Sequence, residues 1–373
     1  MLTLILALQV TAVKADRIIP VAGKEIENGV ILIRDGKIEA IGEKIEVPEG
    51  ATVIEAAVVM PGLVNPYSRT GLAGAGGTAD QTAAEFLDPL SEGFLAEARA
   101  GYTTLVLYPS NGLASGRTAA VKTRPGPAST MLVDADGALR ISFSPSTQNK
   151  EALAKAFGAA KTFIEAEKKA EEEKKKKKEE DKKPKEEKKP PEPTDIDKVF
   201  MSVLKGERKL LVQINGAAGL LHFWRIVDEF KEFSLKITYV LPPDLHRVAD
   251  RLGERKVEVI VDPVVTLLPN TADRICPARV LQEQKCVFAL QPRGNEDVLF
   301  EAAKLIKYGV ERDAVLRALT LTPATFAGIE KRVGSIEKGK DADLLFLSAD
   351  PFDAGTRVRR VMIEGHVVYE DPS

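Results

Sequence analysis

Residue types that commonly carry hydrolytic or metal chemistry are scarce in this sequence. Three histidines and two cysteines occur among 373 residues. The cysteines lack the CxxC spacing of zinc sites, and no Ser-His-Asp set, Cys-His set or GxSxG nucleophile elbow is visible. A structural zinc site or a disulfide framework is therefore not expected. The residues concerned are His222, His246, His366, Cys276 and Cys286.

Polar side chains instead follow several apolar runs, at the places where buried strands would end. The run "AAVVMPGLV" leads into "NPYSRTGL", and "KLLVQINGAAG" and "CVFALQPRGNED" have a similar form. Amide and phenol groups at such ends can hydrogen-bond a ligand, but they cannot activate water as a bound metal does. We expect these side chains to converge on one pocket. Its predicted members are Asn65, Tyr67 and Arg69 from the first run, Gln213 and Asn215 from the second, and Gln291 from the third.

Arg69 gives this predicted pocket a preference for one class of ligand. A guanidinium binds a carboxylate through two parallel hydrogen bonds, so Arg69 with two amides nearby suits a carboxylate-bearing small molecule. The alternative for an arginine on such a loop is a solvated charge.

The elements that must position these residues differ between the ends and the middle of the chain. "ENGVILIRDGKIEAIG" predicts two strands joined by a tight turn at Asp35-Gly36, and "VRRVMIEGHVVYED" predicts a turn at Glu364-Gly365. Neither end has enough alternating apolar residues to be stable alone. We therefore predict one small β-sandwich domain built from residues 1–57 and 333–373.

The middle of the chain, residues 58–332, alternates helices with short apolar strands. "PLSEGFLAEARAGYTTLVLYP" predicts a helix that ends at Gly101 and is followed by a strand, and three later segments have the same order. Such alternation indicates an α/β fold with parallel strands covered by helices, and its length favours a (β/α)8 TIM-like barrel. An open doubly wound sheet is the alternative. No GxGxxG follows the first strand, which disfavours a dinucleotide site.

Residues 161–193 form a charged insertion in this predicted barrel. Lysines and acids nearly balance there, so the segment is not a polybasic arm for a membrane or nucleic acid. Glu and Lys at helical spacing predict a solvated helix that continues from "NKEALAKAFGAAKTFIE", and prolines after Lys183 predict a disordered tether. We favour a solvated spacer, with a partner-binding segment as the alternative.

The remaining composition limits partners and location. The formal charge of −2 and the pI near 6.1 give no reason to expect nucleic acid as a partner. "MLTLILALQV" is either a first strand, which we favour together with a cytoplasmic location, or part of a signal peptide over residues 1–15 that would direct export. No other run approaches the length of a membrane span.

Several motifs together resemble the amidohydrolase superfamily, and in particular imidazolonepropionase-like members. "GSIEKGKDADLLFLSADPFD" with "VRRVMIEGHVVYED" is similar to the C-terminal segment of that family, and "GYTTLVLYPSNGLASGRTAAVKTRP" is similar to its second barrel strand and the following loop. "LRALTLTPATFAGI" resembles its last barrel helix, and "MPGLV" its first barrel strand. The resemblance covers nearly the whole chain and implies the barrel fold.

The resemblance also implies a divalent metal such as zinc, bound by histidines, an aspartate and often a lysine. This sequence departs from that set at each position, so we predict a degenerate metal site and no bound cofactor. Lys122 could mimic a bridging lysine, but without histidines beside it we expect it to be a solvent-facing charge. His246 is expected in a helix after its strand and would not replace a missing ligand either. The positions concerned are Asn65 and Tyr67 for His-x-His, Gln213, Asn215 and Leu241 for later histidines, and Gln291 with the nearby Asp297 for the aspartate.

Three functional hypotheses follow. The first is a metal-free, catalytically inactive binding or scaffolding protein whose partner is a small molecule or an active paralogue, with homo-oligomers expected from the resemblance. The second is a hydrolase of carbon–nitrogen bonds with an atypical or residual metal site. The third is an interaction protein that works through the Lys/Glu-rich segment.

Overall fold

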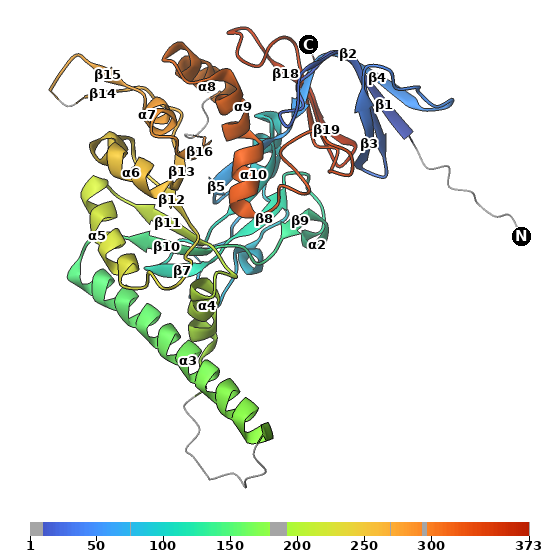
Figure 1. Ribbon diagram of the computed structural model, residues 1–373. Helices are drawn as coiled ribbons and strands as arrows, with labels where there is room; N and C mark the ends of the chain where they lie inside the picture. The colour runs from blue at the N-terminus through green and yellow to red at the C-terminus, as the bar shows by residue number, and fades with distance from the viewer. Residues whose placement is uncertain (1–9, 75, 180–191, 269, 293–296, 373) are drawn as a thin grey trace, which may run out of the picture.

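Both ends of the chain contribute to one seven-stranded sheet, which we call the composite sheet (Figure 1). The computed structural model describes residues 10–74, 76–179, 192–268, 270–292 and 297–372. The ends combine in one continuous sheet, not in the two sheets of the predicted sandwich. The strand order is β19-β18-β17-β4-β1-β2-β3. The bounds are β1 Val10–Ile18, β2 Ile26–Arg34, β3 Lys37–Gly42, β4 Thr52–Pro61, β17 Leu344–Leu347, β18 Val358–Ile363 and β19 His366–Glu370.

Two tight turns in this sheet confirm the predicted hairpins. Asp35 and Gly36 have φ of 51° and 75°, and Glu364 and Gly365 have φ of 48° and 76°. Two consecutive residues in the left-handed region match the right-handed twist of the flanking strands. The two turns also touch, because a Cβ on Gly36 would lie 2.8 Å from the Glu364 carbonyl oxygen.

The parallel strands of the middle region lie in two sheets. One has the order β5-β6-β8-β9 and the other β16-β13-β12-β11-β10-β7. The strands β6 and β10 pair with antiparallel β8 and β7 instead of with each other, so the hydrogen-bond ladder among the described strands is open there. The bounds are β5 Leu63–Ser68, β6 Tyr102–Leu107, β7 Ala114–Arg117, β8 Ala119–Lys122, β9 Leu132–Asp134, β10 Leu139–Phe143, β11 Leu210–Ile214, β12 Ile237–Val240, β13 Glu258–Val261 and β16 Val287–Leu290.

The closed eight-stranded barrel predicted from the sequence is therefore not confirmed. The fold is mixed α/β, and β10, β11, β12, β13 and β16 are parallel neighbours in chain order. This order lacks the reversal that defines a doubly wound sheet. The boundaries of the predicted domains stay a prediction, although β4 continues in the composite sheet to Pro61.

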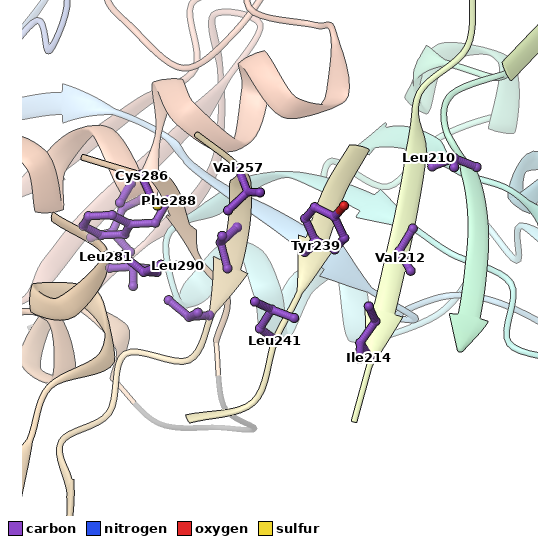
Figure 2. Packing of buried hydrophobic residues seen from close by; sticks show 14 of the residues in the cluster. Leu210, Val212, Ile214, Tyr239, Leu241, Val257, Leu281, Cys286, Phe288 and Leu290 are labelled. Atoms are coloured by element: carbon purple, nitrogen blue, oxygen red, sulfur yellow. The ribbon is translucent and has the colours of Figure 1, made fainter. Parts of the chain in front are cut away.

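Alternate residues of these strands face the covering helices or the interior. Figure 2 shows Leu210, Val212 and Ile214 of β11 with Tyr239 and Leu241 in a single apolar cluster. Among the described residues, no helix is long and apolar enough to cross a membrane. The helices and remaining strands are η1 Ala83–Phe86, α1 Gly93–Arg99, α2 Ala128–Met131, α4 Asp195–Leu204, α5 Ala217–Asp228, η2 Pro243–Val248, α6 Ala249–Arg255, β14 Thr266–Leu267, β15 Arg274–Ile275, α7 Pro277–Glu283, α8 Val298–Lys307, α9 Arg312–Leu319 and α10 Leu321–Ala327.

Apolar side chains fill part of the interior between the two sheets. Phe326 of α10 packs with Leu211, Val240, Ile260 and Ala289, and half-buried Tyr67 borders the same cluster. A cavity of only about 20 Å³ remains beside Phe326. We call the carboxyl ends of β5, β10, β11, β13 and β16 the mouth, because the predicted pocket residues lie at the ends of β5, β11 and β16.

A long helix, α3, spans Thr147–Glu179 and contains the first part of the charged insertion. Its first part is anchored by Phe157, whose ring centroid lies 5.6 Å from that of Phe200 and 5.3 Å from that of Phe230. Figure 1 shows the later part extending away from the sheets. The predicted helix is confirmed to Glu179, and the predicted tether over residues 180–191 lies outside the described residues.

Candidate functional site

A buried arginine, Arg140 of β10, joins polar residues of both central sheets. Its Nη2 atom donates to Gln213 Oε1 at 2.5 Å and to Tyr67 Oη at 3.1 Å. Its Nε atom lies 3.3 Å from the same Tyr67 oxygen, and Nη1 donates to Ser115 Oγ at 3.1 Å. Only 4% of Arg140 is exposed. The guanidinium therefore occupies the interior just below the mouth.

Two stacked tyrosines cover this guanidinium. The rings of Tyr67 and Tyr108 are 3.6 Å apart between centroids and nearly parallel, with an angle of 8°. Arg140 Cζ lies 5.0 Å from the Tyr108 centroid, within range of a cation–π contact. Burial raises the pKa of Tyr67 well above its ordinary value, although Arg140 opposes the shift. Tyr67 is therefore a phenol at neutral pH, and it donates to Gln213 Oε1 at 3.0 Å.

The charge of Arg140 is not balanced by a carboxylate among the described residues. The acceptors of its hydrogen bonds are two hydroxyls and one amide oxygen, all neutral. A buried cation is costly unless an anion or a full set of hydrogen bonds compensates for lost hydration. Arg140 is therefore a buried cation that has only neutral partners among the described residues.

The predicted pocket residues from the first strand do not act together. Tyr67 enters the Arg140 network, as the predicted convergence requires. Asn65 is buried, but its Oδ1 accepts the N–H of Tyr67 at 3.0 Å in a local turn. Arg69 is exposed and donates to the Gly74 carbonyl at 2.9 Å. Its placement matches the alternative of a solvated charge.

Residues predicted from the later strands are also divided. Gln213 joins the network, whereas Asn215 is exposed. Gln291 instead donates through Nε2 to Asp262 Oδ1 at 2.7 Å. Leu241 is buried in the apolar cluster that faces the helices (Figure 2). Asp297 caps α8 by accepting the N–H groups of residues 299 and 300, so its carboxylate has a structural role.

Lys122 is not the solvent-facing charge that the sequence suggested, and this expectation was wrong. Lys122 is 1% exposed, and its Nζ lies 2.5 Å from Asp343 Oδ2 and 2.9 Å from Asp341 Oδ2. Asp341 also pairs with Lys37 and Arg332. We call these five residues the ionic cluster. The ionic cluster joins β8 to the composite sheet, because Lys122 at the end of β8 pairs with Asp341 and Asp343, which lie just before β17.

The pKa values of the two acids in the ionic cluster are shifted in opposite directions. Burial raises the pKa of Asp343, and Lys122 offsets only part of that shift. Burial acts in the same way on Asp341, but there Lys122, Lys37 and Arg332 outweigh it and hold the pKa below its ordinary value. Asp341 is therefore the firmly ionised partner of Lys122.

The described residues were also compared with the ligand set of a divalent metal. Within the described ranges, no group of three or more His, Cys, Asp or Glu side chains could hold a metal ion. The Arg140 network itself consists of a phenol, an amide, a hydroxyl and a guanidinium, which are poor ligands for zinc. His246 lies in η2, where its Nδ1 is 3.3 Å from the Pro243 carbonyl oxygen, while His222 is in α5 and His366 in β19.

Four residues at or near the Arg140 network were not predicted from the sequence as site residues: Arg140, Ser115, Tyr108 and Asp262. For Arg140 a local signal existed, because "ALRISF" places one charge within an otherwise apolar strand. A charged side chain on a buried strand is rare unless it has hydrogen-bond or ion-pair partners. Its partners Tyr67 and Gln213 are each 73 residues away, so no local pattern could identify them.

Comparison with known families and proteins finds matches to parts of this chain. A model described as "Amidohydrolase family" matches residues 291–369. Amidohydrolase tasK of Hapsidospora irregularis is 36% identical over 77 residues, which are 21% of this chain and 8% of that protein. Imidazolonepropionase of Thermoplasma acidophilum is 38% identical over 60 residues, 16% of this chain and 15% of that protein. The matches thus cover a small part of each relative.

Comparison with solved structures covers almost the whole chain. An amidohydrolase from Thermotoga maritima MSB8 has a TM-score of 0.76 and 22% identity, over 97% of this chain and 100% of the other. An adenosine deaminase from Xanthomonas campestris with bound zinc has a TM-score of 0.55 and 18% identity, over 96% and 92% of the two chains. These likenesses show that the mixed α/β fold is the fold of amidohydrolase structures.

Proposed function

We propose that this protein, which has an amidohydrolase-family segment at residues 291–369 on an amidohydrolase fold, is a binding or scaffolding protein that is inactive as a metal-dependent hydrolase. The observation that carries the proposal is the Arg140 guanidinium, which bonds both Tyr67 and Gln213. The resemblance assigns metal-binding histidines to these two positions. A fixed cation therefore lies where a metal would need its ligands.

The electrostatic cost of a metal beside Arg140 is large. A divalent ion about 4 Å from a guanidinium would be repelled by roughly 8 kcal/mol at an effective dielectric constant near 20. Neutral oxygen atoms of Tyr67 and Gln213 cannot offset this cost, because both already accept hydrogen bonds from Arg140. Imidazole and carboxylate ligands would be needed to retain the ion.

The test measures zinc binding in protein that is purified and then dialysed against zinc. We expect well under one zinc ion per chain in the wild type. The Gln213→His variant should gain little affinity, whereas Gln213→His combined with Arg140→Leu should bind zinc at least tenfold more tightly than the single variant. Stoichiometric zinc, iron or manganese in the wild-type protein would overturn the proposal.

The second candidate, a carbon–nitrogen hydrolase with a residual metal, draws support from one observation. Asp262 follows β13 at the mouth, and its Oδ1 accepts from Gln291 Nε2 at 2.7 Å. A carboxylate there can serve as a metal ligand or as a general base. If Asp262→Asn removed both a stoichiometric metal and amide hydrolysis, this second candidate would replace the first.

A further inference from the structure

We propose that the mouth binds a small organic monocarboxylate through the Gln213 amide and the Ser142 hydroxyl, with Arg140 supplying the charge behind them. This inference rests on the proposed function, because it requires the position to be free of metal. It names the class of ligand that a binding protein with this site would take.

The first donor is fixed in direction by the Arg140 network. Gln213 Oε1 accepts hydrogen bonds from both Arg140 and Tyr67. Arginine has only donors, so the oxygen of the amide must face it and the NH₂ group must face the other way. Gln213 is half-buried, and the described residues provide no acceptor for its NH₂ group. The two N–H donors of Gln213 therefore point away from Arg140 and are available to a ligand.

The second donor lies beside the first. Ser142 pairs in register with Gln213 on the neighbouring parallel strand, and it is two residues beyond Arg140 on the same face. Ser142 is half-buried, and no hydrogen bond of its hydroxyl occurs within the part of the chain that is described. Neighbouring strands are about 4.8 Å apart, so both donors can reach one carboxylate group.

The charge favours an anion over a neutral amide as the ligand. Arg140 is buried and has only neutral acceptors among the described residues, so a carboxylate at Gln213 would supply the missing negative charge. A hydrogen bond gains strength when one partner is ionised and the surroundings are of low dielectric constant. One buried cation with neutral partners favours a ligand that carries a single negative charge.

Isothermal titration calorimetry of the full chain with benzoate and with the neutral benzamide tests the inference at constant ionic strength. We expect benzoate to bind at least tenfold more tightly than benzamide. Gln213→Glu should abolish benzoate binding, because the new carboxylate pairs with Arg140 itself. The matched control is Asn215→Asp, which adds the same charge two residues further on at an exposed position and should change the affinity less than threefold.

Ser142→Ala is a second test of the site, in case Gln213→Glu does not fold. It removes one hydroxyl and should weaken benzoate binding threefold or more. Equal binding of benzoate and benzamide, or no binding of either, would overturn the inference. An equal effect of Gln213→Glu and Asn215→Asp would also overturn it. Metal content of the same preparation is measured separately: a stoichiometric metal would overturn the proposed function, and benzoate binding that vanished with that metal would overturn this inference as well.

Discussion

Lys122 and Asp343 form a buried ion pair, with 2.5 Å between Nζ and Oδ2, although 221 residues separate them in the sequence. Lys122 ends β8 in the central region, and Asp343 directly precedes β17 in the composite sheet. Asp343 Oδ1 also accepts the N–H of Glu364 at 3.0 Å. The pair therefore ties the two regions of the fold together.

Replacing Lys122 by methionine should lower the free energy of unfolding by about 3–5 kcal/mol, because two buried carboxylates would lose their shared cation. Urea denaturation monitored by circular dichroism measures the change. Lys198→Met is the matched control, since Lys198 pairs with Asp195 on an exposed helix face and should leave the midpoint unchanged. An equally small effect of both substitutions would show that the ionic cluster does not stabilise the fold.

A second prediction concerns acid stability and Asp350. Its Oδ2 lies 2.7 Å from Arg17 Nη2 and 2.8 Å from Arg312 Nη2. Burial alone would raise the pKa of Asp350, but the Phe352 N–H and the two arginines outweigh it and hold that pKa below its ordinary value. The stabilisation is therefore complete above the unfolded pKa of about 3.9 and is lost as the pH falls through the lower folded pKa.

Asp350→Asn should therefore cost roughly 1 kcal/mol at pH 7, a value discounted for solvent screening, and the difference from wild type should shrink toward pH 2–3. Urea unfolding at a series of pH values measures this. The exposed Asp353→Asn is the control and should show no such pH dependence. A difference that stays constant between pH 7 and pH 2 would contradict the assignment.

The anchoring of α3 gives a third prediction. Phe157 is fully buried between Phe200 and Phe230, so Phe157→Ala should destabilise the protein by about 3–5 kcal/mol through lost packing and the cavity left behind. Lys168→Ala, on an exposed part of the same helix, should leave thermal unfolding unchanged. Equal melting temperatures of the two variants would mean that α3 is not held by this cluster.

Chelation gives a fourth prediction. If packing and the Arg140 network hold the mouth together without a bound ion, EDTA should leave the melting temperature unchanged within about 1 °C. Differential scanning calorimetry with and without EDTA measures this. A fall of several degrees that added zinc reverses would reveal an ion that contributes folding energy.

Local features of this fold could be predicted from the sequence, and distant pairings could not. The turn at Asp35-Gly36 was predicted correctly, because it depends only on two adjacent residues that adopt the left-handed backbone conformation readily. The repeating Glu and Lys of α3 likewise gave a helix to Glu179. The closed barrel was not confirmed because β7 and β8 occupy the pairing edges of β10 and β6. Nothing in the short segments "ASGR" and "AAVK" indicates that pairing.

The candidate site shows the same limit. Gln213 and Tyr67 were found because they follow strand-like runs, but Arg140, which bonds both, was missed. Lys122 was assigned to solvent because a lone lysine usually is exposed, and its acids are more than 200 residues away. A sequence shows which side chains could lie at a strand end, whereas their partners depend on the arrangement of whole sheets.

The helix α3 has a hydrodynamic consequence. Its 33 residues span roughly 50 Å, nearly the diameter of about 54 Å of a sphere whose radius of gyration is the ~21 Å expected for a compact chain of this length, and its later part extends away from the sheets. A rod on one side increases friction and slows tumbling, so a monomer should elute from a sizing column ahead of globular standards of 40.5 kDa. Elution volume alone would suggest a dimer where none exists, and light scattering is the measurement that separates shape from mass.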